Sequence, residues 1–139
     1  MRPPRQILLP GPPQRLRLSR RRGDRLPDNA VSVARPTRWG NPFTVHPLPD
    51  GTWTVRDLGD LSRSLREEPP RCPDKWSATV MAVRLFELHC RPAPEGLRTL
   101  YPDYPNPAEL AGLHLACWCS PLLPCHADSL LRLANPEPT

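Results

Sequence analysis

Residues 113–128 read Leu-His-Leu-Ala-Cys-Trp-Cys-Ser-Pro-Leu-Leu-Pro-Cys-His-Ala-Asp and carry the strongest structural signal in the chain. The apolar first part of this stretch, residues 113–118, predicts a buried strand. Pro124 suits the first position of a helix that ends before Pro136, and its apolar face would come from Leu130, Leu131, Leu133 and Ala134. A strand, a short loop and a helix in succession are typical of α/β domains, so we predict that fold class.

Further elements are expected toward the N-terminus. Residues 30–34 (Ala-Val-Ser-Val-Ala) predict a first strand that ends before Pro36. Residues 44–46 and 52–55 flank a Pro-Asp-Gly turn sequence and predict a hairpin. The apolar spacing from Asp74 or Ser77 to His89 predicts a core-facing helix. Shorter helices are expected over residues 60–68 and from an Asn106 cap to Gly112.

The chain of 139 residues is long enough for one domain with a modest core. We predict a small single α/β domain over residues 28–135, with a short sheet and flanking helices, followed by a tail over residues 136–139. Residues 1–27 hold six prolines, eight arginines and no sustained hydrophobic period. This composition predicts a disordered basic arm.

The formal net charge of +5 is unevenly distributed. Of 19 basic and 14 acidic residues, eight and one fall within residues 1–25, which leaves 11 and 13, and so a net charge of −2, for the remainder. The expected folded part is therefore not basic, and we expect at most weak contact with nucleic acid through the arm.

Apolar runs are too short in this sequence to cross a bilayer, so we expect no membrane partner. The apolar residues 7–9 are also too few for the core of a signal peptide. We therefore expect a cytoplasmic protein. In that reducing compartment, metal binding or catalysis is a more common use of cysteine than a disulfide framework.

Four residues form the candidate reactive cluster. Alternation along a strand places Cys117 and Cys119 on one face, and Cys125 and His126 fall in the expected first helical turn together with Asp128. The helix N-terminus should depress the pKa of Cys125. Three interpretations remain open: a zinc site formed by Cys117, Cys119, Cys125 and His126, a catalytic or ligand-binding site, or thiols buried as small hydrophobic groups.

The loop over residues 35–43 (Arg-Pro-Thr-Arg-Trp-Gly-Asn-Pro-Phe) is a second candidate site. Arg35 and Arg38 could clamp a phosphate or carboxylate, Asn41 could orient a polar edge, and Trp39 or Phe43 could stack on a base. That combination suits a nucleotide. In the alternative interpretation, Trp39 and Phe43 anchor the loop on the core and the arginines stay in solvent.

These two stretches resemble the family catalogued as domain of unknown function 4326, small proteins of bacteria and phages. The matching motifs are Arg35-Pro36, Trp-Gly-Asn-Pro-Phe at 39–43, Cys-Trp-Cys at 117–119 and Cys-His-Ala-Asp at 125–128. The likeness covers about residues 31–135 and is looser in the middle, where residues 91–107 are rich in proline. The resemblance implies a family but no particular reaction.

The two motifs together predict a small enzyme that binds a nucleotide or nucleoside and hydrolyses or transfers at a glycosidic or phosphate bond. Arg35 and Asn41 would position the ligand, Cys125 would hold its anion, and His126 or Asp128 would act as acid or base. The alternative is a non-enzymatic, zinc-stabilised module that binds nucleic acid. The enzymatic hypothesis requires the arginine-bearing and thiol-bearing stretches to meet around a common pocket in the folded chain.

Overall fold

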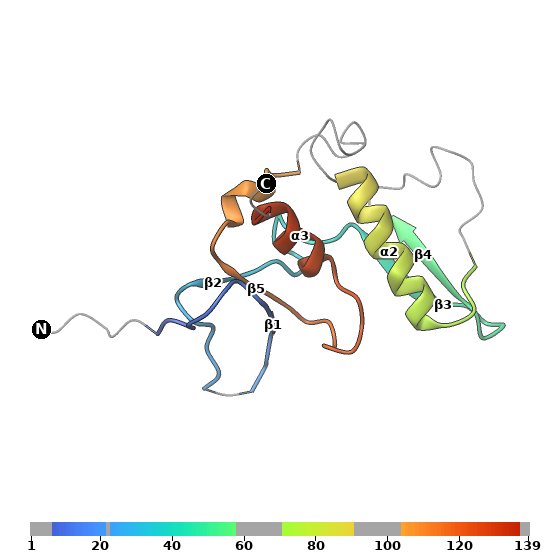
Figure 1. Cartoon of the computed structure of the whole chain (residues 1–139). Coiled ribbons are helices and arrows are strands. Elements are labelled where there is room, and N and C mark those ends of the chain that lie inside the picture. The colour runs from blue at the N-terminus through green and yellow to red at the C-terminus, as the bar shows by residue number, and fades with distance from the viewer. Residues whose placement is uncertain (1–6, 22, 58–70, 91–103, 137–139) are drawn as a thin grey trace, which may run out of the picture.

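A computed structural model of the chain describes residues 7–21, 23–57, 71–90 and 104–136 (Figure 1). The elements in chain order are β1 (Arg15–Arg17), β2 (Ala30–Ser32), β3 (Phe43–Pro47), β4 (Trp53–Asp57), α2 (Lys75–Cys90), the 3-10 helix η2 (Pro107–Leu110), β5 (His114–Cys117) and α3 (His126–Ala134). These elements form a small α/β domain with short sheets and flanking helices, as the sequence predicts. The expected helix over residues 60–68 lies outside the described residues.

Strand β5 is the centre of a parallel three-stranded sheet with the order β1-β5-β2. All four of its residues are buried, which is typical of a parallel strand covered on both faces. Val31 of β2 is aligned with Leu115, and Leu16 of β1 is aligned with Ala116. The chain then turns through a short loop into α3, which packs back on β5. The strand-loop-helix unit predicted from residues 113–135 is therefore confirmed.

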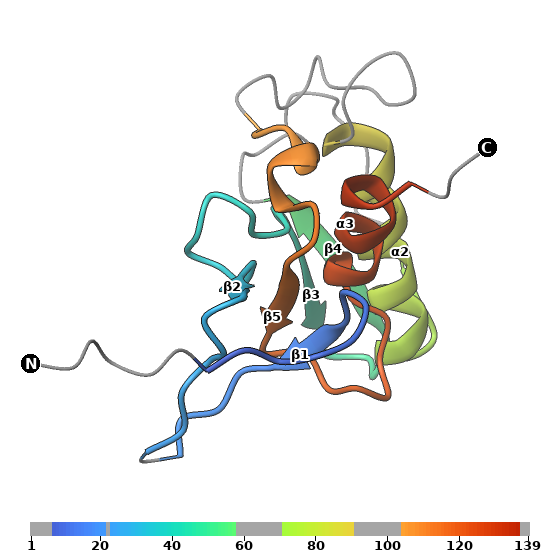
Figure 2. The same cartoon turned by 60° about the vertical axis from the view of Figure 1, so that its left-hand side comes forward.

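The hairpin of β3 and β4 forms a second, antiparallel sheet. Its turn has Gly51 at φ 88°, a left-handed conformation that glycine adopts without strain. Helix α2 packs against both strands, and α3 lies beside α2 on the side toward the parallel sheet (Figures 1 and 2). The two helices thus join the two small sheets into one body. The expected hairpin and core-facing helix are both present.

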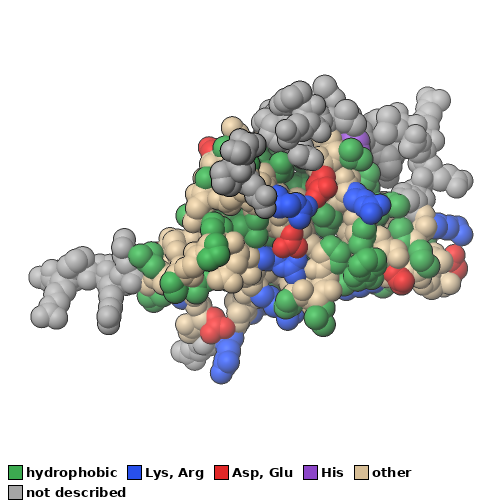
Figure 3. Space-filling model, in the orientation of Figure 1, with side chains coloured by type: hydrophobic (Ala, Val, Ile, Leu, Met, Phe, Trp, Pro, Cys, Tyr) green, Lys and Arg blue, Asp and Glu red, His purple; other side chains and the backbone are tan. Residues whose placement is uncertain are grey.

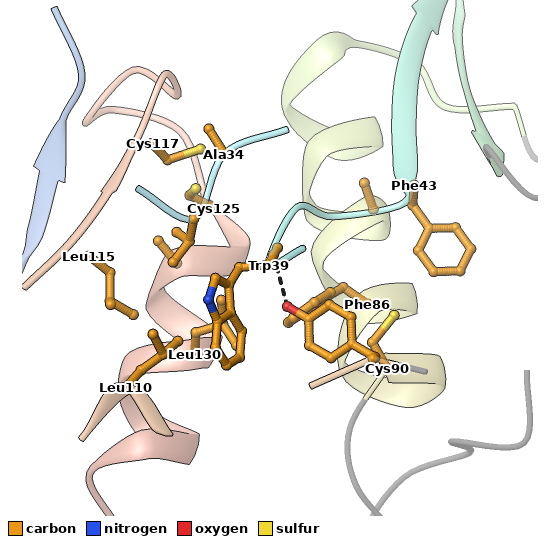
Figure 4. Close-up of a cluster of buried hydrophobic side chains, with 14 of the residues drawn as sticks. Ala34, Trp39, Phe43, Phe86, Cys90, Leu110, Leu115, Cys117, Cys125 and Leu130 are labelled. Atoms are coloured by element: carbon orange, nitrogen blue, oxygen red, sulfur yellow. Dashed lines mark hydrogen bonds between the residues drawn. The ribbon is translucent and has the colours of Figure 1, made fainter. Parts of the chain in front are cut away.

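The core fills the space between α2, α3 and β5 (Figure 4). Phe86 of α2 is at its centre, with 1% of its surface exposed, and its ring meets those of Tyr104 and His126 edge to face at centroid distances of 5.5 and 5.4 Å. The Tyr104 hydroxyl donates a hydrogen bond to the Trp39 carbonyl at 2.8 Å. The core therefore anchors the loop that follows β2.

The N-terminal stretch differs from the expected disordered arm. Arg15–Arg17 forms β1, in register with Leu115–Cys117 of the central strand. The backbone N–H of Gln14 donates to Nδ1 of buried His114 at 3.1 Å, and the backbone N–H of Leu9 donates to the Asn29 side chain at 3.0 Å. For residues 7–21 the expectation of disorder is therefore wrong. The physical reason is that β5 needs a partner on its second edge, because its backbone groups are buried.

Candidate functional site

One pocket of about 200 Å³ brings the two candidate stretches together. Arg35 and Asn41 line it from the loop after β2, and Cys117, Cys119, Cys125 and His126 line it from the β5–α3 connection. Apolar side chains from β3 and α2, among them Val45 and Val83, complete the wall. Figure 4 shows the side chains of Cys117 and Cys125 beside Ala34, which also lines the pocket. Segments about ninety residues apart therefore meet around one cavity.

The three thiols and one imidazole form a tight cluster. The Sγ atoms of Cys117 and Cys119 are 3.6 Å apart, and Sγ of Cys125 is 3.6 Å from Nδ1 of His126. The donor atoms of Cys117, Cys125 and His126 all lie within 4.8 Å of one another, and all three residues are buried. Cys119 is partly exposed. The strand end supplies one thiol, the loop supplies the second, and the start of α3 supplies the third together with the imidazole.

His126 has a defined tautomer. Its Nε2 is 2.7 Å from the carbonyl oxygen of Val33. Since a carbonyl can only accept, Nε2 carries the proton and donates it. Burial lowers the pKa of His126, so the imidazole is neutral near pH 7. Nδ1 is then unprotonated and presents its lone pair toward Cys125.

The three thiols shift one another's pKa values in opposite directions. Hydrogen bonds from the thiols of Cys119 and Cys125 lower the pKa of Cys117, while the pKa of each donating thiol is raised because its proton is engaged. Cys125 occupies the N-cap position of α3, and its side chain makes no capping bond. The expected depression of the Cys125 pKa is therefore wrong. The hydrogen bonds with Cys117 and Cys119, together with burial, raise the pKa of Cys125 in spite of its place at the helix N-terminus.

Arg35 and Asn41 have different roles in the pocket wall. Nη1 of Arg35 donates to the Asn41 carbonyl at 2.7 Å. The Asn41 side chain accepts from the backbone N–H of Phe43 at 2.9 Å and donates to the carbonyl of Ala82 at 3.2 Å. A Cβ atom on Gly40 would lie 2.7 Å from Cγ of Arg35, so this close approach requires glycine. Asn41 thus holds the loop on α2, and the guanidinium group of Arg35 gives the pocket wall a positive charge.

Three of the predicted site residues lie away from the pocket lining. Trp39 is 4% exposed and packs edge to face on Tyr104, so it anchors the loop in the core. Arg38 lies over the outer face of that indole and pairs with Glu109 at 3.5 Å. Asp128, on the first turn of α3, pairs with Arg15 at 2.7 Å.

Sequence reasoning missed two contributors to the site. The Val33 carbonyl fixes the His126 tautomer. Arg15 holds the thiol-bearing loop, because its Nη2 donates to the Ser120 carbonyl at 2.9 Å while its Nη1 pairs with Asp128. A signal for Arg15 was present in the alternation Arg-Leu-Arg-Leu over residues 15–18. It was obscured by the surrounding proline and arginine.

Fold and site together define a small α/β domain with a thiol and imidazole cluster at the carboxyl end of a parallel strand. Residues 16–136 match the family described as domain of unknown function (DUF4326), and the chain belongs to that family. Neither curated proteins nor solved structures gave a match. Among the described residues, no helix has the length and apolar character needed to cross a membrane.

Proposed function

We propose that the protein is a small enzyme that binds a nucleotide or nucleoside in this pocket and acts on it at a glycosidic or phosphate bond. One observation carries the proposal: the cationic Arg35 and the reactive cluster of Cys117, Cys125 and His126 line the same cavity. A guanidinium group is suited to a phosphate or carboxylate. Thiol and imidazole groups are common nucleophiles and bases.

The size and lining of the cavity support part of a nucleotide as the ligand. Its volume of about 200 Å³ is below the roughly 300–1,000 Å³ of typical ligand sites. A base or a nucleoside fragment would therefore fill it, with charged groups toward the rim. Phe43, Val45 and Val83 offer apolar surface for such a fragment. Trp39, which is held in the core, is not available to stack on it.

The groups proposed to act on the ligand lie at the end of the pocket that the cysteines line. Nδ1 of His126 is unprotonated and lies 3.6 Å from Sγ of Cys125 at the pocket wall, so it can accept a proton from the bound molecule. The N-terminus of α3, where Cys125 occupies the N-cap position, presents backbone N–H groups that favour an anionic group of the ligand. Asp128, engaged by Arg15, would support the loop instead of acting on the ligand.

A ligand screen tests this proposal with a matched control from the same loop. Thermal shift against nucleotides, nucleosides and bases should give a positive shift for at least one compound. Arg35→Ala should abolish that shift, whereas Arg38→Ala should preserve it, because Arg38 pairs with Glu109 outside the pocket. Chromatography of the positive compound after incubation should show a cleaved or transferred product. Equal shifts in all three proteins, or no shift with any compound, would reject the pocket as a nucleotide site.

One further observation favours nucleic acid as a second candidate ligand. Trp118 is 43% exposed, and the guanidinium of Arg20 lies 5.0 Å from the centre of its ring. An exposed aromatic ring beside a cation is typical of surfaces that stack on single-stranded bases. On the face in Figure 3, however, acidic and basic side chains are interspersed. A salt-sensitive mobility shift with single-stranded RNA or DNA that Trp118→Ala removes would support this candidate, and no shift at low salt would reject it.

A further inference from the structure

The thiol cluster has the dimensions of a tetrahedral metal site. With Zn–S of about 2.3 Å and Zn–N of about 2.0–2.1 Å, a regular tetrahedron separates two sulfurs by about 3.8 Å and a sulfur from a nitrogen by about 3.6 Å. The observed separations are 3.6 Å between Cys117 Sγ and Cys119 Sγ, and 3.6 Å between Cys125 Sγ and His126 Nδ1. Two opposite edges of a tetrahedron are therefore already present.

Two of the remaining edges, those from Cys117 to Cys125 and to His126, need only small side-chain movements. The donor atoms of Cys117, Cys125 and His126 lie within 4.8 Å of one another, so closing them around an ion requires shifts of about 1 Å. Cys119 can complete the set because it lies on the loop after β5, is partly exposed and already contacts Cys117.

His126 is oriented as a metal-binding histidine. Metal ligands of this type usually donate their second ring N–H to a carbonyl or carboxylate, which fixes the tautomer and leaves the other nitrogen for the ion. Nε2 of His126 donates to the Val33 carbonyl at 2.7 Å, and the ring is held by an edge contact with Phe86. The unprotonated Nδ1 therefore points into the cluster without any change in the fold.

We propose that the protein binds one Zn²⁺ through Sγ of Cys117, Cys119 and Cys125 and Nδ1 of His126. Three thiolates and one imidazole select zinc over magnesium or calcium, which prefer oxygen ligands. The ion joins the end of β5, the following loop and the start of α3. Such a link stabilises a connection that is otherwise held by few apolar contacts, because Leu122 in the loop is 88% exposed.

Two arginines lie near the proposed ion. Zn²⁺ with three thiolates and a neutral imidazole has a net charge of −1. Arg35 lines the same pocket, and Arg15 contacts the Ser120 carbonyl next to Cys119. A buried negative centre is costly unless cations or hydrogen-bond donors lie close to it. Arg35 therefore places a positive charge beside the centre, whereas the charge of Arg15 is shared with Asp128, to which it is paired.

The zinc site goes beyond the proposed enzymatic function and is tested separately from it. With the ion bound, the three thiolates and Nδ1 of His126 are metal ligands and do not act as nucleophile or base, so the part of the proposed function that remains is ligand binding by Arg35 and the pocket. A zinc-free protein that still binds a nucleotide through Arg35 would retain the proposed function and reject the metal site. A zinc protein that binds no nucleotide would do the reverse.

Metal analysis of the untagged, full-length protein decides the proposal. We expect about one zinc per chain after purification without added metal. Removal by a chelator should lower the midpoint of thermal unfolding, and added Zn²⁺ should restore it. A protein that is purified without zinc and shows no saturable response to added Zn²⁺ would overturn the site.

Cobalt substitution identifies the ligands. The sulfur-to-Co²⁺ charge-transfer absorption of the wild type should correspond to three thiolates, and Cys119→Ser should lose about a third of it. Cys72→Ser is the matched control, because Cys72 is a buried cysteine outside the cluster, and it should leave the spectrum unchanged. An unchanged spectrum in Cys119→Ser would overturn the four-ligand set. The partly exposed position of Cys119 favours folding of this variant, so the result does not depend on substituting the buried thiols.

Discussion

Replacing Arg15 with Met tests whether the N-terminal strand is an integral part of the domain. Methionine keeps most of the apolar stem of the side chain but removes the guanidinium. Two contacts are lost: the ion pair with Asp128 at 2.7 Å and the hydrogen bond to the Ser120 carbonyl at 2.9 Å. Both contacts tie β1 to the segment that carries the thiol cluster.

The size of the effect follows from the exposure of the partners. The Arg15 side chain is 14% exposed and that of Asp128 is 43% exposed. The ion pair is therefore partly screened by solvent and contributes about 0.5–1 kcal/mol. The charged hydrogen bond to a carbonyl adds about 1.5 kcal/mol. We expect Arg15→Met to lower the free energy of unfolding by about 2 kcal/mol, which corresponds to roughly 8 °C in Tm for a domain of this size.

Urea unfolding followed by far-UV circular dichroism measures this change. Arg25→Met is the control, because Arg25 pairs with Asp28 at the surface with 59% of its side chain exposed; we expect a change below about 0.5 kcal/mol. A double-mutant cycle with Asp128→Asn isolates the ion pair from the Ser120 contact. If Arg15→Met is as stable as Arg25→Met, β1 does not hold the thiol-bearing loop and the reasoning is refuted.

Three other substitutions test the core, the pocket wall and the contact between the helices. Leu115→Ala removes a side chain with no exposed surface from the central strand and should cost about 2–5 kcal/mol in urea unfolding; a loss below 1 kcal/mol would contradict its place in the core. Gly40→Ala should reduce the thermal shift that a nucleotide induces as strongly as Arg35→Ala does. The new Cβ would lie 2.7 Å from Cγ of Arg35 and displace that side chain. An undiminished shift would show that nucleotide binding does not depend on the position of Arg35. Ser129→Ala removes the 2.6 Å hydrogen bond to Glu87 that links α3 to α2 and should cost about 1 kcal/mol by the same unfolding assay, whereas an unchanged midpoint would show that this bond adds nothing to the helix contact.

Elements with strong local patterns were predictable from the sequence. The apolar run of β5, the hairpin around Gly51 and the helix ending at Cys90 each carry their signal within one short window. Strand β1 was not predicted, because its signal is only four residues long and its pairing partner lies a hundred residues away. The sequence around β1 shows only an alternation of polar and apolar residues, and this does not indicate parallel pairing with a strand so far along the chain.

The residue types of the candidate site were predictable from the sequence, but the orientation and contacts of its side chains were not. Cys117, Cys119, Cys125 and His126 stand out by chemistry alone, and the structure gathers them. Trp39 carries the same sequence signal whether it stacks on a ligand or anchors a loop, and only its packing against Tyr104 separates the two. The direction of each thiol's pKa shift likewise depends on which thiols lie beside it, and the sequence does not show this.

The parallel sheet explains why the cluster lies where it does. Parallel strands end at the same edge of a sheet, and sites in α/β folds collect there. After β2, the Val33 carbonyl orients His126. After β1, the backbone N–H of Leu18 donates to the Cys117 carbonyl at 2.9 Å. Each strand thus fixes one part of the cluster, so a ligand or ion that binds the assembled cluster and not the unfolded chain must stabilise the whole sheet. Loss of either flanking strand should therefore weaken binding at the cluster even though neither strand contributes a cysteine.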